Sequence, residues 1–150
     1  MMISYETAKK ILKQAKIKIE NEQISAENSY NRVVAENIYS PYDYPSADNA
    51  AFDGYAINSN DTKNINKKKP RLFQIIGSIA AGNKPLNKRV KKFQSIEIMT
   101  GGIISKPFDT IIPIEQINFY PNKLSPKSIV VNQKIKRFKH VRFKGSDFKK

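Results

Sequence analysis

The feature that most constrains this chain is a short stretch from Pro45 to Ala56, with the sequence PSADNAAFDGYA. Asp48 and Asn49 favour a turn because both side chains can bond the backbone just ahead of them. Asp53 and Gly54 form a second turn signal, and a strand is predicted to begin directly after them. A carboxylate at the tip of such a turn can face a metal ion or a polar ligand. A lone Asp-Gly pair is nevertheless most often a simple hairpin turn.

The composition excludes several kinds of site. The chain has 150 residues, no cysteine and one histidine, His140, so disulfides, thiolate metal sites and multi-histidine metal sites are excluded. Hydrophobic residues make up 39% and charged residues 27% of the chain, which is typical of a soluble globular protein. No apolar run is long enough for a membrane span, and no secretory signal is recognised. Together with the lack of cysteine, this favours a cytoplasmic location.

The formal net charge of +14 would attract the chain to polyanions. Most of the excess is lysine, whereas bidentate recognition of phosphates and bases prefers arginine. The alternative explanation of the lysine excess is drift toward residues that are encoded by A/T-rich codons. One segment, Lys136 to Asp147, interleaves basic and aromatic residues, a pattern that suits binding of single-stranded nucleic acid by charge and stacking.

The first residues of the chain predict an amphipathic helix. Ser4 is a suitable N-cap, and apolar residues recur at helical spacing as far as Ile19. We expect the helix to end near Asn21 and to pack its apolar face on the protein's own core or on a second copy. The lysine-rich polar face leaves a membrane surface as the alternative partner.

Later segments predict short strands separated by polar loops. Strands are expected at residues 71–78 and 128–131, where β-branched and aromatic residues gather. The polar, lysine-rich residues 58–70 predict a solvated loop. Asn31 is an expected left-handed position, because asparagine tolerates that conformation.

A second motif follows at residues 98–102, Ile-Met-Thr-Gly-Gly. The hydroxyl of Thr100 and the backbone amides of Gly101 and Gly102 are predicted to form a concave donor site for an oxyanion. Glycine suits such a site because it lets a ligand approach the backbone closely. On its own, however, a Thr-Gly-Gly sequence is usually only a turn.

Taken together, these motifs resemble the signatures of the molybdopterin molybdenumtransferase family, which includes the gephyrin E domain. The family writes the first stretch as Pro-x-x-x-Asn-Ser-x-Met-Asp-Gly-Tyr-Ala, which is similar to the sequence from Pro45 to Ala56. It writes the second as Ile-x-Thr-Gly-Ala-x-x-Pro-x-Gly-Ala-Asp, with which Thr100, Gly101 and Asp109 are in register.

A third family pattern, Asn-Ile-Arg-x-x-Gly-Glu-Asp, resembles the segment that contains Arg142, Gly145 and Asp147. The chain departs from the family at Gly102, where alanine is usual, and at Ser146, where glutamate is usual. These departures indicate a divergent member. The matching segments occur in the family's order and cover nearly the whole chain.

The resemblance implies an α+β chain that comprises the first two domains of the family. Residues 1–45 and 140–150 would be parts of an elongated first domain that begins with the amphipathic helix. Residues 46–139 would form a small β-rich, barrel-like second domain inserted into it. The pterin-binding domain and the C-terminal domain would be absent. The chain would then be inactive alone, either as a fragment or as a genuine short product.

The resemblance also implies an enzyme of molybdenum cofactor biosynthesis, which inserts molybdate into adenylylated molybdopterin (molybdopterin-AMP) and releases AMP with the help of Mg²⁺. Asp53, Thr100 and Asp147 would be catalytic, and the carboxylates of Asp53 and Asp147 would contact the metal. The residues that would bind the cofactor are Asn49, Gly54, Tyr55, Gly101, Gly102, Arg142 and Gly145. A homodimer would share the active cleft between its subunits.

Two other functions are consistent with the sequence. One is a non-catalytic basic module that binds RNA or single-stranded DNA, which the net charge of +14 favours. The other is a dimerisation scaffold, which the N-terminal amphipathic helix favours.

Overall fold

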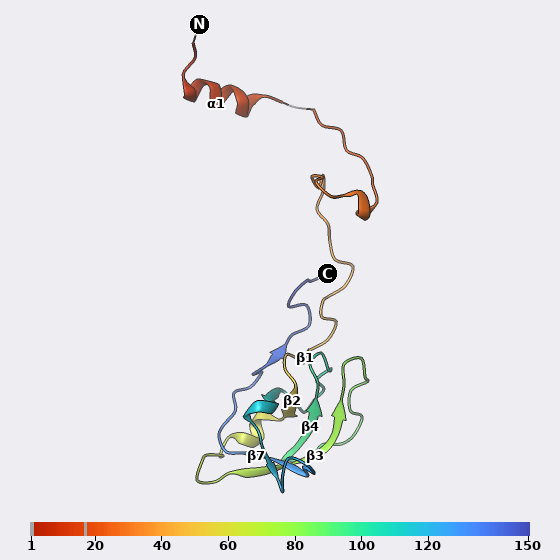
Figure 1. The fold of residues 1–150 in the computed structure, drawn as a ribbon, viewed down its shortest axis with the longest axis vertical. Coiled ribbons are helices and arrows are strands. Elements are labelled where there is room, and N and C mark those ends of the chain that lie inside the picture. Colours follow the sequence, from red (N-terminus) through yellow and green to blue (C-terminus); the bar gives the residue numbers. More distant parts are fainter. Residues whose placement is uncertain (1, 17) are drawn as a thin grey trace. The chain divides into compact units, whose positions relative to one another are not determined.

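The structure is a computed structural model that describes residues 2–16 and 18–150 of the chain. Figure 1 shows its course, which divides into two units, residues 1–38 and residues 39–150. Positions 1 and 17 lie outside the described residues, including the part of the predicted helix at position 17.

The first unit contains one α-helix, α1 (Tyr5–Gln14). Ser4 caps it as predicted, because its side chain accepts a hydrogen bond from the backbone N–H of Thr7 at 3.2 Å. The predicted end near Asn21 is wrong: the helix stops at Gln14, and Ala15 is already extended with ψ 112°. A helix this short is marginal without packing, and no residue of α1 is buried.

The rest of the first unit is largely irregular. It contains a single turn of 3₁₀-helix, η1 (Ala26–Asn28). Asn31 has φ 61°, so its predicted left-handed conformation is confirmed. Among the described residues of this unit none is buried, so the apolar side chains of α1 have no core within the unit to pack on.

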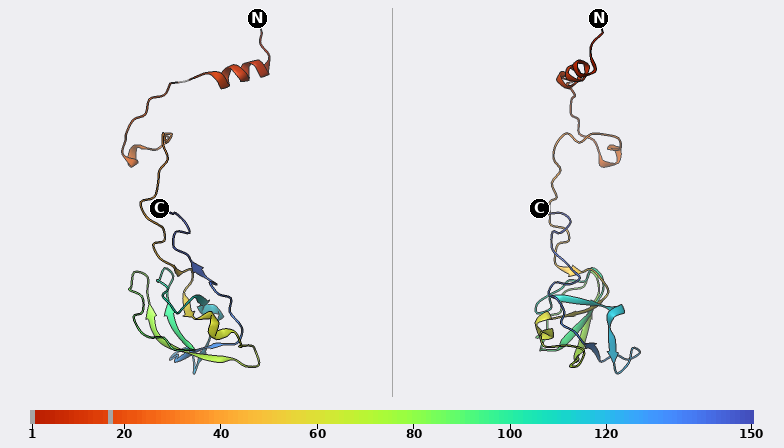
Figure 2. Two further views of the ribbon diagram at one scale, coloured as in Figure 1. Left: turned by 180° about the vertical axis from the view of Figure 1, so that it is seen from behind. Right: turned by 90° about the vertical axis from the view of Figure 1, so that its left-hand side faces the viewer.

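The second unit is built around a sheet of six strands. Across the sheet these are β5 (Thr110–Pro113), β2 (Gly54–Ile57), β4 (Gln94–Ile98), β3 (Arg71–Ile79), β7 (Ser128–Val131) and β6 (Asn118–Tyr120). Only the pair β3–β4 is parallel, and the other neighbours run antiparallel. The sheet curls like half of a barrel, which Figure 2 shows from two sides.

The curled sheet buries side chains on both of its faces. Along β2, Tyr55 and Ile57 belong to one apolar cluster and Ala56 to the other, because successive side chains point to opposite faces. Phe73 anchors the first cluster and Ile96 the second, and both are fully buried. This two-sided burial explains why every residue of β2 is buried instead of every second one.

A second, two-stranded sheet joins the entry and the exit of the unit. It pairs β1 (Asn49–Ala50) with β8 (Val141–Arg142). Farther out, Tyr44 bridges to Phe148. The segments before β1 and after β8 therefore lie side by side. The assignment of residues 140–150 to a separate first domain stays a prediction.

The sequence predicted the strands at 71–78 and 128–131, and both are confirmed as β3 and β7. The prediction of a solvated loop at 58–70 is wrong in part. That segment contains a 3₁₀-helix, η2 (Ser59–Thr62), in which Thr62 is fully buried, and Ile65 enters the first apolar cluster.

The observed class is mostly β, with a curled half-barrel sheet and the single α-helix α1 among the described residues. The expected β-rich part is therefore confirmed, whereas the α+β description and the insertion of one domain into another stay predictions. No helix within residues 2–16 and 18–150 is long and apolar enough to cross a membrane.

Gly54 is the position at which close strand packing most requires a glycine. A Cβ there would lie 2.1 Å from the backbone oxygen of Ile112 on β5. We expect Gly54→Ala to lower the free energy of unfolding by about 3 kcal/mol, because β2 and β5 would have to separate. Urea unfolding followed by circular dichroism measures this loss.

Gly77→Ala is the matched control, because its Cβ would meet Leu86 Cδ1 at an ordinary 3.8 Å. We expect it to cost less than about 1 kcal/mol. Equal stability of the two variants would contradict the close approach of β2 to β5.

Candidate functional site

The turn before β2 and the turn after β4 are joined by one carboxylate. Asp53 Oδ1 accepts hydrogen bonds from the backbone N–H of Thr100 at 2.6 Å and from its hydroxyl at 2.7 Å. The strand pairing explains this contact. Because β2 and β4 are antiparallel with Gly54 opposite Ile98, Asp53 before β2 lies close to Thr100 after β4. We call this arrangement the Asp53–Thr100 clasp.

The clasp sets the electrostatics of Asp53. The N–H of Thr100, and then its hydroxyl, hold the pKa of this carboxyl below its usual value. Asp53 therefore remains ionised to a lower pH than an ordinary aspartate. Both bonds go to Oδ1, which leaves Oδ2 as the atom to meet a ligand.

The glycines after Thr100 do not form the predicted oxyanion site in this structure. Their amides are occupied: Gly101 donates to the carbonyl of Ala50 at 2.9 Å and Gly102 to that of Met99 at 2.8 Å. Gly101 has φ +81°, which suits glycine and turns its N–H toward β1. A Cβ on Gly102 would lie 2.8 Å from Ile98 Cγ1. Glycine is therefore explained at position 101 by the positive φ and at position 102 by packing.

A second polar group follows β8. Arg142 forms an ion pair with Asp147, whose Oδ1 also accepts from the hydroxyl of Ser146 at 3.1 Å. Arg142 lowers the pKa of Asp147 below its usual value. Gly145 has φ +66° and donates its N–H to the carbonyl of Pro45 at 2.9 Å, which fixes the turn between the two charged residues.

Strand β1 connects the two polar groups. Asn49 pairs with Arg142 in the small sheet, and Ala50 accepts from Gly101 of the Thr-Gly-Gly turn. The side-chain oxygen of Asn49 is buried and has no hydrogen-bond partner among the described residues. Such an oxygen carries a cost unless a ligand or a water satisfies it. Asn49 thus remains a candidate contact.

The structure removes two other predicted residues from the surface of the site. Tyr55 is 3% exposed and its ring packs edge-on against Phe119. Gly54 is enclosed by β5. Both are core residues, because the strand that follows the Asp53 turn is buried on both faces.

Three carboxylates that support this region were not among the predicted site residues. The carboxylate of Asp48 accepts from the N–H of Lys144 at 2.8 Å, and Asp43 accepts from the N–H of Lys150 at 3.0 Å. Asp109, which matches the family pattern, accepts from the N–H of Ser59 at 2.7 Å and so caps η2 instead of facing a ligand. The sequence signalled only the turn pair at Asp48 and the family match at Asp109, because the partners of all three carboxylates are far away in the sequence.

A complete Mg²⁺ site does not arise from these residues alone. The described residues contain no group of three or more His, Cys, Asp or Glu side chains that could hold a metal ion. Asp147 is already paired with Arg142, which makes it a poor metal ligand. Asp53 fits the part of a single carboxylate ligand, since Mg²⁺ is commonly held by one or two carboxylates together with substrate phosphates and water.

The fold of this chain is similar to that of solved proteins of molybdopterin biosynthesis. The structure of the molybdopterin biosynthesis moeA protein from Pyrococcus horikoshii OT3 superimposes with a TM-score of 0.82 at 29% identity, covering 100% of this chain and 38% of that one. The fold of this chain is therefore of the class found in these biosynthetic proteins, of which it corresponds to one part.

Residues 3–150 match the family model described as the MoeA N-terminal region (domain I and II). The chain therefore belongs to this family. It is 28% identical over 96% of its length to a molybdopterin molybdenumtransferase of Staphylococcus epidermidis, and 29% identical over 99% of its length to one of Haemophilus influenzae. The chain covers 33% of the length of the staphylococcal protein and 35% of the length of the Haemophilus protein.

The clasp makes a testable prediction about the titration of Asp53. Thr100→Val removes the hydroxyl donor but keeps the backbone N–H, so the pKa of Asp53 should rise only part of the way to its usual value. Because the folded pKa is depressed, the clasp stabilises the fold above the unfolded pKa, and this contribution is lost as pH falls through the folded value. Carbon-13 NMR of the carboxyl carbon measures the titration.

Ser59→Ala serves as the control, because it removes a hydroxyl donor from Asp109 and leaves the clasp intact. Asp53 should titrate in this variant as in the unmodified protein. An unchanged Asp53 titration in Thr100→Val would show that the hydroxyl bond does not form in solution.

Proposed function

We propose that this chain forms the N-terminal part of a molybdopterin molybdenumtransferase. The reaction would insert molybdate into the dithiolene of adenylylated molybdopterin and release AMP. The observation that carries the proposal is the family match over residues 3–150, together with an Asp53–Thr100 clasp formed by its two most specific motifs.

The chain spans about a third of the curated relatives that it matches. We therefore propose that binding of the pterin depends on segments that correspond to the rest of those relatives. We also propose a homodimer in which the two subunits share the active cleft, since the clasp is exposed where β2 begins and β4 ends. On this proposal the chain alone is inactive.

Asp53 is proposed to contact the metal or the nucleotide through Oδ2. The Thr100 bonds hold its other oxygen and keep the carboxylate ionised. Bound Mg²⁺ would supply positive charge to the phosphate oxygens as the adenylyl group leaves. Thr100 is then a positioning residue, because its hydroxyl already donates to Asp53.

Arg142 is proposed to hold a phosphate oxygen of the substrate. A guanidinium can donate to two oxygens at once, and the pairing with Asp147 restricts its orientation. Asp147 would then lie near the nucleotide through Arg142 instead of binding the metal directly. Asn49 lies opposite Arg142 in the β1–β8 sheet, and its unpaired oxygen is the further contact proposed there.

The contacts of residues 136–147 do not favour nucleic-acid binding by that segment over the transferase proposal. Arg137 lies over the ring of Phe138 at 4.3 Å, and Phe138 packs edge-on against Phe143 at 5.3 Å. Arg137 also pairs with Asp109 at 3.1 Å. Arg137 is thus engaged within the protein, although Phe138 and Phe143 each remain 43% exposed.

The transferase proposal can be tested in a chimera. Residues 3–150 replace the matching third of the staphylococcal relative, and release of AMP from adenylylated molybdopterin is measured with molybdate present. We expect the chimera to be active and Asp53→Asn to reduce its rate by about 100-fold, because a group that contacts the developing charge is lost.

Glu20→Gln is the control, an exposed carboxylate of the first unit whose change should leave the rate within about twofold. Folding is checked in parallel by circular dichroism. A folded chimera whose Asp53→Asn variant keeps the full rate would refute the assigned role of Asp53. A folded but inactive chimera would refute the transferase assignment.

A further inference from the structure

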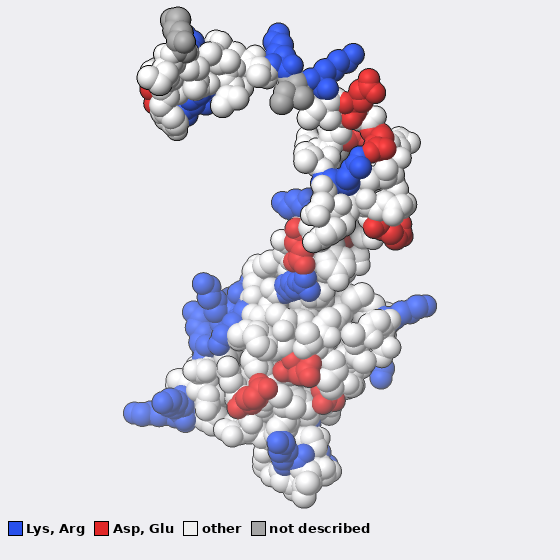
Figure 3. Space-filling model, turned by 45° about the horizontal axis from the view of Figure 1, so that its top comes forward, with Lys and Arg blue, Asp and Glu red and all other residues white. Residues whose placement is uncertain are grey.

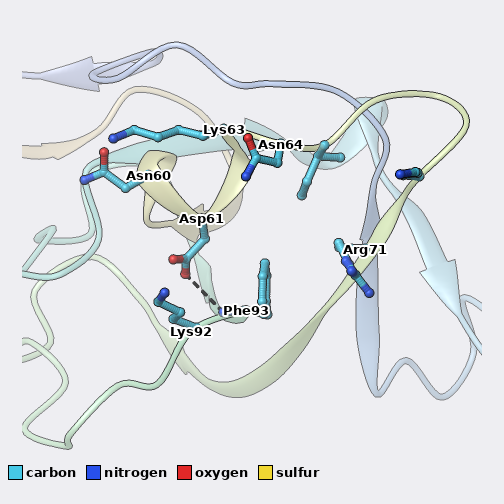
Figure 4. Close-up of a pocket in the computed structure, with 9 residues that line it drawn as sticks. Asn60, Asp61, Lys63, Asn64, Arg71, Lys92 and Phe93 are labelled. Carbon is cyan, nitrogen blue, oxygen red and sulfur yellow. Dashed lines mark hydrogen bonds between the residues drawn. The ribbon is translucent and has the colours of Figure 1, made fainter.

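A hollow lies at the end of the sheet opposite the clasp. It has a volume of about 380 Å³ and is lined by residues of η2, of the start of β3 and of the residues just before β4. Figure 4 shows Asp61 and Phe93 directed into it, with Arg71 and Lys92 at its sides. A cavity of this size lies within the range that holds a small ligand.

The parallel pairing of β3 and β4 separates this hollow from the candidate site. Phe93 immediately precedes β4, whereas Thr100 follows its end at Ile98. The five residues of β4 span roughly 16 Å at about 3.3 Å per residue. A ligand in the hollow would therefore not meet Asp53.

The lining of the hollow is strongly basic. It includes the exposed cations Lys63, Lys69, Arg71 and Lys92, although Lys63 extends away from the centre in Figure 4. The one carboxylate among the lining residues, that of Asp61, already accepts the backbone N–H of Phe93 at 3.0 Å. The positive charge is thus largely uncompensated, and concave basic surfaces concentrate anions.

An aromatic ring completes the lining. Phe93 has φ 57°, a conformation that is uncommon for a bulky residue and often marks a functional position. Its ring packs edge-on against Phe73 of the core at 5.5 Å, and the residue remains 37% exposed. The exposed part of the ring faces the hollow (Figure 4) and offers a surface on which a planar base can stack.

We propose that this hollow binds a phosphorylated ligand that carries a base, with the phosphate held by Arg71 and Lys92 and the base against Phe93. The same chemistry is presented by a free nucleotide and by a single strand of nucleic acid. Nothing in the proposed transferase reaction requires this second site. Lysine and arginine side chains lie at several separate places on the surface (Figure 3), and the hollow gives those that line it a specific role.

The proposal is tested with the full chain and defined probes. Binding of AMP is measured by calorimetry, and binding of a fluorescein-labelled ten-nucleotide RNA by anisotropy, each at two salt concentrations. We expect the double variant Arg71→Gln/Lys92→Gln to weaken binding at least about tenfold, because two charge-assisted contacts are lost. Loss of these contacts should also reduce the salt dependence.

The matched control is Lys84→Gln/Lys88→Gln, which removes the same charge from exposed positions of the same unit. It should weaken binding by less than about twofold if the hollow is the site, since only the general attraction changes. Equal losses in the two double variants, or no binding of either probe, would overturn the proposal. Tighter binding of AMP would identify a nucleotide site, and tighter binding of RNA a strand site.

The role of Phe93 is tested separately. Ribose 5-phosphate is AMP without its base, so a ring that stacks on the base predicts weaker binding of ribose 5-phosphate than of AMP. Phe93→Asn keeps a residue that tolerates positive φ and should abolish this difference. Thermal unfolding checks that the variant folds. A folded variant that still prefers AMP to the same degree would overturn the assignment of Phe93.

Discussion

The antiparallel pairing of β2 with β4 is the constraint on which the candidate site depends. It brings the turn before β2 against the turn after β4, so that the Asp53 carboxylate meets both donors of Thr100. On the other side of β2, β5 approaches too closely for a side chain at Gly54. Strand β2 thus needs the glycine of the first motif for its pairing with β5, while its pairing with β4 brings Asp53 of that motif to the threonine of the second.

The sequence predicted part of the site because the residue types of a short turn motif indicate which chemical groups the turn presents. Asp53 and Thr100 were singled out as a carboxylate and a hydroxyl in turns, and the structure shows that they meet. The acceptors of the glycine amides are harder to predict. Gly102 donates to Met99 within its own turn, but Gly101 donates to Ala50, and nothing in a Thr-Gly-Gly sequence shows that β1 will lie within reach.

The errors in the predicted fold have a common physical origin. Helix α1 stops at Gln14, although the periodic pattern continues, since no residue of its face is buried and propensity alone does not sustain a long helix. Residues 58–70 look solvated because lysine and asparagine dominate them, yet Thr62 and Ile65 are buried. In both cases tertiary contact, or its absence, overrides the local composition.

The basic hollow is also invisible in the sequence, because Asp61, Arg71 and Phe93 belong to separate segments. The parallel alignment of β3 with β4 brings them together, and it requires the long connection of residues 80–93 between the two strands. The same alignment places the carboxylate of the clasp and the cations of the hollow at opposite ends of β4. The two ends of β4 therefore carry opposite charges. One end presents the ionised Asp53 held by Thr100. The other presents the cations of the hollow, beside which Asp61 is already bonded to the N–H of Phe93. A short strand that carries different turns at its two ends can in this way support two chemically independent surfaces.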